Sequence, residues 1–368
     1  MSVCKTWNTM IKSHTFISSH LQHSLSNNPL FLIRDLTLSN QEQYSLCSSS
    51  FRIISNPQYS FSLPSNKFLS FVGSLNGVVC LYDNNNSNYI DNIILWNPLI
   101  RKHLQLPTPI FTSETLGEFY TFALGLGFDS KRNDFKVVRV CYDLNGRAVP
   151  PKVELYSLND GAWRVIDASY LELRVIHCTK QLIFHGNVHW LAYKVTEGDP
   201  YGCNCIMMFN VEKEMFNEMK LPEELGTVSS NNLAISVIDG WLSVIEYSSF
   251  RSYGNTRCDI WMCREESWSK IYCVDLERGF TELLGLSTLD EVLLVPFISS
   301  YRRMMSLRSF DLISLEMKDI GIQITGKGLC ASDFTESLVL LDKESNAAVS
   351  CTLLYVYFYF FMLLQVIF

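Results

Sequence analysis

The chain has 368 residues, of which 48% are hydrophobic and 13% aromatic, and its formal net charge is −7 at pH 7. This composition supplies a sizeable core and excludes a mainly disordered protein. A protein that binds nucleic acid needs clustered Lys and Arg to displace counterions from phosphates, so the acidic balance argues against nucleic acid as a partner.

The cysteines and the N-terminus together predict a cellular compartment. Twelve cysteines are scattered along the chain without any CxxC pair, and the closest two are Cys203 and Cys205. Because a free cysteine behaves as a small buried hydrophobe, this pattern predicts a reduced protein. The segment from Met1 to Trp7 lacks the apolar stretch of a signal peptide. We therefore expect a cytoplasmic or nuclear location, or both.

Residues 1–24 predict short helical structure. Apolar residues recur there at three- and four-residue steps, the period of one helix face: Val3, Trp7, Met10, Ile11, Phe16, Ile17 and Leu21. The run from Asn27 to Pro29 then breaks the helix. Helices of this size cannot bury their own apolar faces, so we expect them to pack on another part of the chain or on a partner.

Residues 30–343 read as a long series of strands. Short runs rich in Val, Ile, Leu, Phe and Tyr alternate with turn dipeptides such as Asn76-Gly77, Asn145-Gly146 and Asp239-Gly240. Asn-Gly and Asp-Gly between apolar runs favour tight hairpins. This pattern predicts an all-β fold with few helices.

A loose repeat runs through this region and predicts a β-propeller. Aromatic residues mark equivalent points about 50 to 60 residues apart, with about four strands per unit. They are Trp96, Tyr156, Phe209, Trp261 and Phe310. We expect about six blades, the sixth completed by residues 338–341 pairing with residues 52–55, although five blades or more than six remain open. Such closure would remove exposed sheet edges.

Several fragments, in this order and spacing, carry a resemblance to a known family. They are the N-terminal run 3–8 with Ile11, Ser13, Phe16, Ile17, His20 and Leu21; residues 73–81; residues 95–98 with Arg101, Lys102, Leu106 and Pro107; residues 126–129 and 134–138; and residues 153–158, 186–190 and 260–262. Together they resemble plant F-box proteins with an F-box-associated, kelch-like domain. The similarity spans residue 3 to about residue 343, and only the last part of the F-box is matched.

The resemblance implies a division into three parts. Residues 1–24 correspond to a partial F-box, residues 30–343 to an F-box-associated β-propeller-like domain, and residues 344–368 to an atypical hydrophobic tail. In this family the F-box holds the Skp-type adaptor of a cullin-based ubiquitin ligase, and the associated domain binds a target protein. The implied function is that of a non-catalytic substrate-recognition subunit without a cofactor or metal.

The N-terminal residues leave alternatives open, both for their own contacts and for the function of the chain. The residues Trp7, Ile11, Phe16 and Leu21 face either the adaptor or the body of the domain. The Leu-Pro opening of an F-box is not present before them, so the alternative function is a truncated interaction module that no longer binds the adaptor. A third class, a propeller enzyme, would need convergent carboxylates or metal ligands, and the repeat positions do not supply them.

The tail from Cys351 to Phe368 is almost wholly apolar and is just long enough to span a bilayer. It predicts either a membrane anchor or translated sequence that does not belong to the domain, and we favour the second. A membrane is otherwise not an expected partner.

Other candidate sites are weak. His185 and His189 have the spacing of a helical metal site, but Gly186 and Asn187 between them predict a hairpin, so we interpret both as structural. Gly125 and Gly127 lack the third glycine of a dinucleotide motif, and Glu265-Glu266 is typical of a solvated turn.

One loop offers aromatic anchors for a protein substrate. Trp241, Tyr247, Phe250 and Tyr253 surround a polar stretch at residues 248–256. Trp and Tyr bury a large area at small entropic cost, so we predict substrate contacts here, with ordinary blade packing as the alternative.

Overall fold

The protein is described from a computed structural model. The structure describes residues 5–25, 30–38, 41–56, 69–83, 92–116, 120–143, 150–176, 181–196, 199–248, 257–275, 280–286, 291–296, 304–326 and 328–343. The predicted tail and the predicted contact residues Phe250 and Tyr253 lie outside these ranges.

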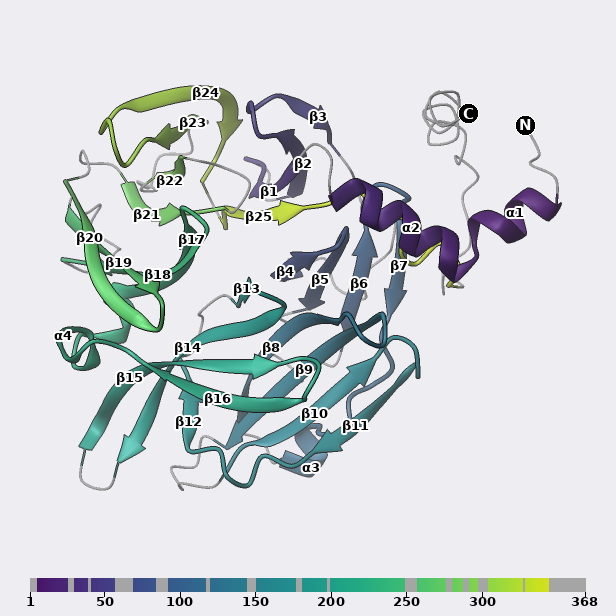
Figure 1. The fold of residues 1–368 in the computed structure, drawn as a ribbon, viewed down its shortest axis with the longest axis horizontal. Coiled ribbons are helices and arrows are strands. Elements are labelled where there is room, and N and C mark those ends of the chain that lie inside the picture. The colour runs from purple at the N-terminus through teal and green to yellow at the C-terminus, as the bar shows by residue number, and fades with distance from the viewer. Residues whose placement is uncertain are drawn as a thin grey trace.

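The described strands form six antiparallel sheets arranged as the blades of a propeller (Figure 1). Blade 1 contains β4 (Leu69–Leu75), β5 (Val78–Asp83), β6 (Ile93–Asn97) and β7 (Lys102–Gln105). Blade 2 contains β8 (Tyr120–Asp129), β9 (Asp134–Asp143), β10 (Lys152–Ser157) and β11 (Ala162–Ile166). Blade 3 contains β12 (Leu173–Val175), β13 (Leu182–Phe184), β14 (Asn187–Thr196), β15 (Asp199–Asn210) and β16 (Met215–Lys220).

The remaining strands complete the ring. Blade 4 contains β17 (Leu233–Ile238), β18 (Trp241–Tyr247), β19 (Arg257–Arg264) and β20 (Ser267–Asp275). Blade 5 contains β21 (Phe280–Leu284), β22 (Val292–Pro296), β23 (Met305–Phe310) and β24 (Met317–Ile324). Blade 6 contains β25 (Cys330–Phe334), β1 (Leu30–Leu36), β2 (Glu42–Ser48) and β3 (Ile53–Ser55).

The sixth blade closes the ring, but through different residues from those predicted. The closing strand is β25, which pairs antiparallel with β1, so Leu30 lies opposite Phe334. The predicted pairing of residues 338–341 with residues 52–55 is wrong, because Leu338 and Leu341 lie in a buried turn beyond β25. The true closing strand carries Ser332 and Asp333 and has no apolar run like that of residues 338–341.

Polar side chains fix blade 6 to both of its neighbours. Arg34 of β1 donates to the carbonyl oxygen of Leu69 in blade 1 at 2.7 Å, and Glu42 accepts from the Leu69 N–H at 2.8 Å. On the other side, Asp35 accepts from the backbone N–H of Thr325, which follows blade 5, at 2.6 Å. The ring is therefore closed by specific hydrogen bonds as well as by strand pairing.

The predicted repeat is confirmed, with one shift in register. Trp96, Tyr156, Phe209 and Phe310 all lie at or next to the last residue of the third strand of a blade. Trp261 lies on the third strand of blade 4, but Cys263 occupies the matching position, opposite Trp268. The face of the strand is unchanged because side chains alternate with a period of two.

The predicted turn chemistry is also present. Asn76 and Asp239 have φ of 48° and 51°, and each is followed by a glycine that is also left-handed. These conformations are those of a tight hairpin turn, which Asn, Asp and Gly adopt at low cost.

Two N-terminal helices, α1 (Lys5–Ile11) and α2 (His14–Leu25), lie beside blade 1 and project beyond the edge of the propeller (Figure 1). Ser13 separates them and caps α2, because its Oγ accepts from the Phe16 N–H. The other described helices are short: α3 (Ser113–Leu116), α4 (Glu223–Gly226) and the 3-10 helix η1 (Ser230–Asn232). Within the described ranges, the helices all fall short of the length and apolar character needed to cross a bilayer.

Candidate functional site

The two helices rest on the C-terminal segment of residues 335–343, which continues from the closing strand. Asn97, at the end of β6, is fully buried and donates to the carbonyl oxygens of Ser337 at 2.9 Å and Val339 at 3.0 Å. Lys102 donates through Nζ to the carbonyl oxygens of Leu341 at 3.3 Å and Lys343 at 2.8 Å. Both side chains come from blade 1, so this blade holds the C-terminal segment along its length.

The same segment forms part of the core beneath the helices. Leu338 and Leu341 belong to one hydrophobic cluster with Ile11 of α1 and Ile17 of α2, together with residues of blades 1 and 2. Their packing gives the helices the apolar partner that the sequence required. The orientation of α1 and α2 is thus tied to the C-terminal segment.

The structure separates the four residues predicted to face an adaptor or the body. Ile11 and Leu21 are 8% and 3% exposed, and Phe16 packs partly buried against the cluster that contains Ile11. Trp7 is 46% exposed, and Met10, on the same face one turn later, is 45% exposed. Contact between these residues and an adaptor remains a prediction, and in this conformation Trp7 and Met10 are the accessible ones.

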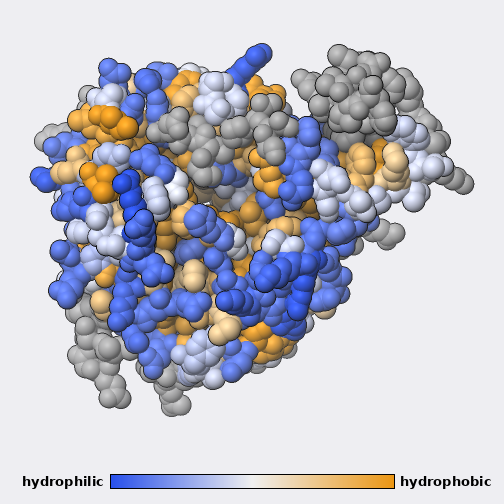
Figure 2. Space-filling model, in the orientation of Figure 1, coloured by the Kyte–Doolittle hydropathy of each residue, from blue (hydrophilic) through white to orange (hydrophobic). Residues whose placement is uncertain are grey.

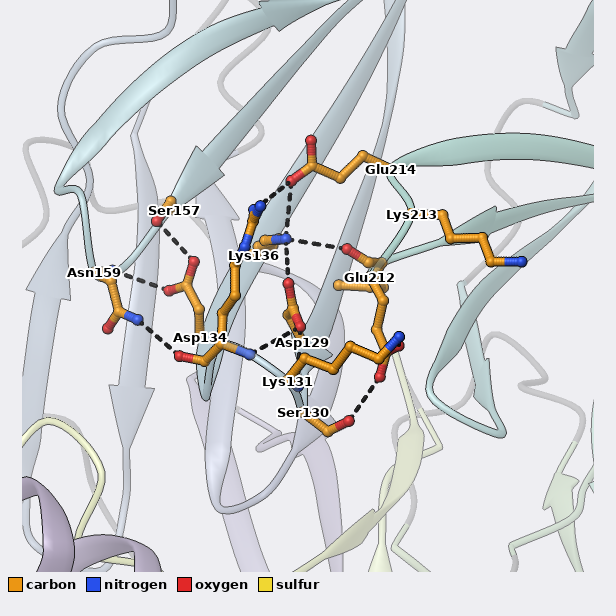
Figure 3. A network of polar contacts seen from close by, with 12 residues as sticks. Asp129, Ser130, Lys131, Asp134, Lys136, Ser157, Asn159, Glu212, Lys213 and Glu214 are labelled. Atoms are coloured by element: carbon orange, nitrogen blue, oxygen red, sulfur yellow. Dashed lines mark hydrogen bonds and ion pairs between the residues drawn. The ribbon is translucent and has the colours of Figure 1, made fainter.

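A polar network joins blades 2 and 3 on the side of the propeller that holds the helices (Figure 3). At its centre the Lys136 ammonium, 2% exposed, donates to Asp129 at 2.7 Å, to Glu214 at 2.9 Å and to the Val211 carbonyl oxygen at 3.1 Å. A buried ammonium requires this complete set of acceptors, because an unpaired buried charge is strongly destabilising.

The two carboxylates that bind Lys136 have lowered pKa values, which favour their ionised form. Burial of Asp129 opposes ionisation, but the Lys136 ammonium and the backbone N–H groups of Arg132 and Lys131 hold its pKa below the usual value. The pKa of Glu214 is also lowered, because Arg164 and Lys136 outweigh the effect of its burial. The network is therefore a charged structural clasp between two blades.

One turn connects this network to the helices. Residues 130–133 join β8 to β9, and the Arg132 and Lys131 N–H groups bond to Asp129. At the end of the turn, Asn133 has φ of 48° and donates through Nδ2 to Ser18 Oγ of α2 at 2.9 Å. The turn that blade 3 braces therefore also contacts α2.

Two of the four predicted substrate-contact residues, Trp241 and Tyr247, lie in the part of the chain that the structure describes. Trp241 and Tyr247 lie at opposite ends of β18. Tyr247 is 3% exposed, and its hydroxyl accepts from the backbone N–H of Leu283 in blade 5 at 3.0 Å, so it packs between blades. Trp241 is 38% exposed, and the Arg264 guanidinium lies 5.5 Å from its ring centroid.

The two histidines lie in different environments. His185 is exposed in a hairpin turn with φ of 48° and stacks on Phe184. His189 is 2% exposed, and its burial lowers its pKa to about 4, which keeps it neutral. Within the described residues no group of three or more His, Cys, Asp and Glu side chains has the arrangement of a metal site.

Sequence reasoning missed the roles of Asn97, Lys102 and Asn133. The first two stood only as part of a family-like pattern, and Asn133 gave no signal. Their hydrogen bonds join residues more than 100 positions apart, as with Asn97 and Ser337, 240 positions apart. A long-range contact of this kind has no counterpart in local spacing or periodicity.

Comparison with known proteins matches this chain to a domain family and to plant proteins that carry an F-box. Residues 40–287 match the model of the F-box associated beta propeller domain. An F-box protein of Arabidopsis thaliana is 25% identical over 364 residues, which cover 90% of this chain and 82% of that protein. F-box protein CPR1 of the same plant is 27% identical over 301 residues, covering 73% of this chain and 67% of the relative.

Proposed function

Because this chain belongs to the family of proteins with an F-box associated β-propeller domain, we propose that it is the substrate-recognition subunit of an SCF-type (Skp–cullin–F-box) E3 ubiquitin ligase. In this function the helices α1 and α2 bind the Skp-type adaptor and the propeller binds a target protein. Ubiquitin transfer is carried out by other subunits, so the chain acts without a catalytic residue or cofactor.

The observation that carries the proposal is the fixed seat of the helices on the propeller. Ile11 and Ile17 share a core cluster with blades 1 and 2, and Asn133 bonds to Ser18. A receptor that presents a target to a distant ligase subunit needs its two binding surfaces in a constant geometry. Trp7 and Met10, about half exposed on one face of α1, are the proposed adaptor contacts.

A second candidate function is an interaction module that does not recruit the adaptor. The burial of Ile11 and Leu21 favours it, because buried side chains in the F-box-like region are not accessible to an adaptor. Both functions place the protein in the cytoplasm or the nucleus, where ubiquitin ligases and their targets occur.

The experiment that separates the two is retention of a purified plant Skp-type adaptor on the immobilised full chain. The first function predicts retention, and its loss in a Trp7→Ala/Met10→Ser double variant. The matched control is Ile53→Ser/Ile54→Ser on β3, which alters two residues of similar exposure (42% and 54%) away from the helices. Absence of retention by the native chain would contradict the first function and support the second.

A further inference from the structure

The turn between the third and fourth strands of blade 5 differs from its counterparts. Strand pairing, together with the backbone hydrogen bond from the Asp311 N–H to Glu316 in blade 5, aligns four of these turns, and in each the last residue of the turn is left-handed. These residues are Arg101, Gly161, Glu214 and Leu315, with φ of 53°, 67°, 57° and 58°. Leucine is the unusual one, since its side chain is 61% exposed and gains nothing from burial.

The residue two positions earlier shows the same contrast. Ile313 of blade 5 is 83% exposed, whereas its counterparts in blades 2 and 3 are polar, Asn159 and Glu212. The blade 1 counterpart, Leu99, is also apolar, but it packs partly buried against a core cluster, and the next residue, Ile100, is 7% exposed and lies in the cluster formed with the helices and the C-terminal segment. An apolar turn of blade 1 is therefore covered by protein, and the matching turn of blade 5 is open.

The blade 5 turn is held rigidly. Asp311 accepts hydrogen bonds from the backbone N–H groups of Ile313 at 2.8 Å and Ser314 at 3.0 Å. The Leu315 N–H donates to the Asp311 carbonyl oxygen at 2.9 Å. Because the backbone is already ordered, contact with these side chains would cost little conformational entropy.

The exposed apolar surface continues onto blade 4. Trp241 is 38% exposed beside Arg264, and the neighbouring Asp239 accepts a hydrogen bond from Tyr272 at 3.0 Å. Burial and this hydrogen bond raise the pKa of Tyr272, and Asp311 of blade 5 adds to the increase. Ile238, which precedes the blade 4 turn, and Leu312 of the blade 5 turn belong to one hydrophobic cluster, and Tyr272 packs against that cluster. The blade 4 and blade 5 turns therefore lie side by side.

The charges around this surface indicate the kind of partner. Asp239, Glu265, Glu266 and Glu316 are all exposed in these turns, and Arg264 is the cation that lies over Trp241. We propose that Trp241, Ile313 and Leu315 form a docking surface for a protein segment that combines apolar side chains with Lys or Arg. This proposal rests on the proposed function, in which the segment belongs to the ubiquitination target.

The test is fluorescence anisotropy with two labelled amphipathic peptides of about 18 residues, one of Leu and Lys and one of Leu and Glu. The full chain should bind the Leu/Lys peptide and bind the Leu/Glu peptide at least about tenfold more weakly. Ile313→Ser/Leu315→Ser and Glu265→Lys/Glu266→Lys should each weaken Leu/Lys binding by at least about tenfold.

Two matched variants control for general stickiness and net charge. Ile53→Ser/Ile54→Ser removes exposed apolar side chains elsewhere, and Glu223→Lys/Glu224→Lys reverses an exposed acidic pair on α4. Both should bind the Leu/Lys peptide as the native chain does. Equal losses in the control variants, equal binding of the two peptides, or absence of binding would overturn the docking surface.

Two parallel measurements separate this proposal from others. If sedimentation shows a dimer of the native chain that Ile313→Ser/Leu315→Ser converts to a monomer, the surface binds a second copy and the proposal is overturned. Adaptor retention by the same preparations reports on the proposed function. A chain that retains the adaptor but not the peptide contradicts the docking surface alone.

Discussion

The side chain of Asn97 donates a hydrogen bond to the carbonyl oxygen of Val339, a residue 242 positions later in the chain. This contact joins the first blade to the segment that follows the closing strand. Since Leu338 and Leu341 pack in the same cluster as Ile11 and Ile17, the contact also supports the helices. Closure of the propeller and placement of the helices are therefore parts of one structural unit.

Replacement of Asn97 by alanine should loosen the helices. The substitution leaves the buried carbonyl oxygens of Ser337 and Val339 without their donor, so we expect a loss of about 2 to 4 kcal/mol in the free energy of unfolding. Relative to the native chain, hydrogen exchange in the variant should be faster in α2 and in residues 335–343 and unchanged in blade 4.

Gln105→Ala is the matched control, because Gln105 of the same blade makes an exposed side-chain hydrogen bond to Asn92 at 2.9 Å. It should leave exchange in α2 unchanged. Unaltered exchange of α2 in Asn97→Ala would show that the C-terminal segment does not hold the helices.

Replacement of Asp129 by asparagine should destabilise the clasp between blades 2 and 3. It leaves the buried Lys136 with one fewer carboxylate, and we expect a loss of about 3 kcal/mol near pH 7. Because the pKa of Asp129 is lowered in the folded protein, its contribution is present above its unfolded pKa and is lost as the pH falls through the folded value. The gap between native and variant in chemical denaturation should therefore narrow below about pH 4.

The comparison for this variant is Glu212→Gln, which alters a surface ion pair with Lys131 that has an N–O distance of 3.0 Å. Lys131 is exposed and Glu212 partly so, and solvent weakens such a pair, so its loss should cost far less than the loss of Asp129. Equal effects of the two substitutions would mean that the buried ammonium tolerates the loss of Asp129.

Replacement of His189 by glutamine should flatten the acid side of the stability profile. Its folded pKa is about 4, so the unfolded chain binds the extra proton between about pH 6.5 and pH 4. Over this range the free energy of unfolding of the native protein falls with decreasing pH, by up to about 1.4 kcal/mol per pH unit from this group. The variant should lack that part of the slope, while His185→Gln should keep it. A slope that His189→Gln leaves intact would contradict the neutral, buried state of the imidazole.

Replacement of Gly127 by alanine should destabilise the interface between blades 2 and 3. A Cβ at this position would lie 2.4 Å from the Cγ2 of Val211, on the other side of the blade interface. Overpacking of this kind costs about 1 to 3 kcal/mol. Gly161→Asn is the control, since a Cβ there meets no atom within 4 Å and asparagine tolerates the left-handed φ of 67°. A thermal midpoint for Gly127→Ala equal to that of the control would show that the interface can yield.

Much of the fold could be predicted because propeller strands and turns are local features. The third-strand aromatics such as Tyr156 and the hairpin at Asp239 follow from runs of a few residues. The closing strand could not be predicted in the same way. The apolar character of Leu338 and Leu341 reflects burial between blade and helix, and periodicity alone does not distinguish this from a buried strand.

The candidate site was less predictable than the fold. Trp241 and Tyr247 were predicted to flank one loop, but they are the first and last residues of β18 and so lie at opposite ends of a strand. The apolar residues of the N-terminal helices were recognised, but which of them face the body depends on residues 335–343, far away in the sequence. The exposure of Ile313 and Leu315 is unusual only in comparison with the matching turns of other blades, and that match follows from strand pairing.

The most direct test of the central claim is titration calorimetry of the full chain with a purified plant Skp-type adaptor. The account predicts one adaptor per chain with a Kd of about 1 µM or tighter, and binding at least about tenfold weaker for Trp7→Ala/Met10→Ser. Absence of heat at these concentrations, with the chain folded by circular dichroism, would contradict its function as a ligase receptor.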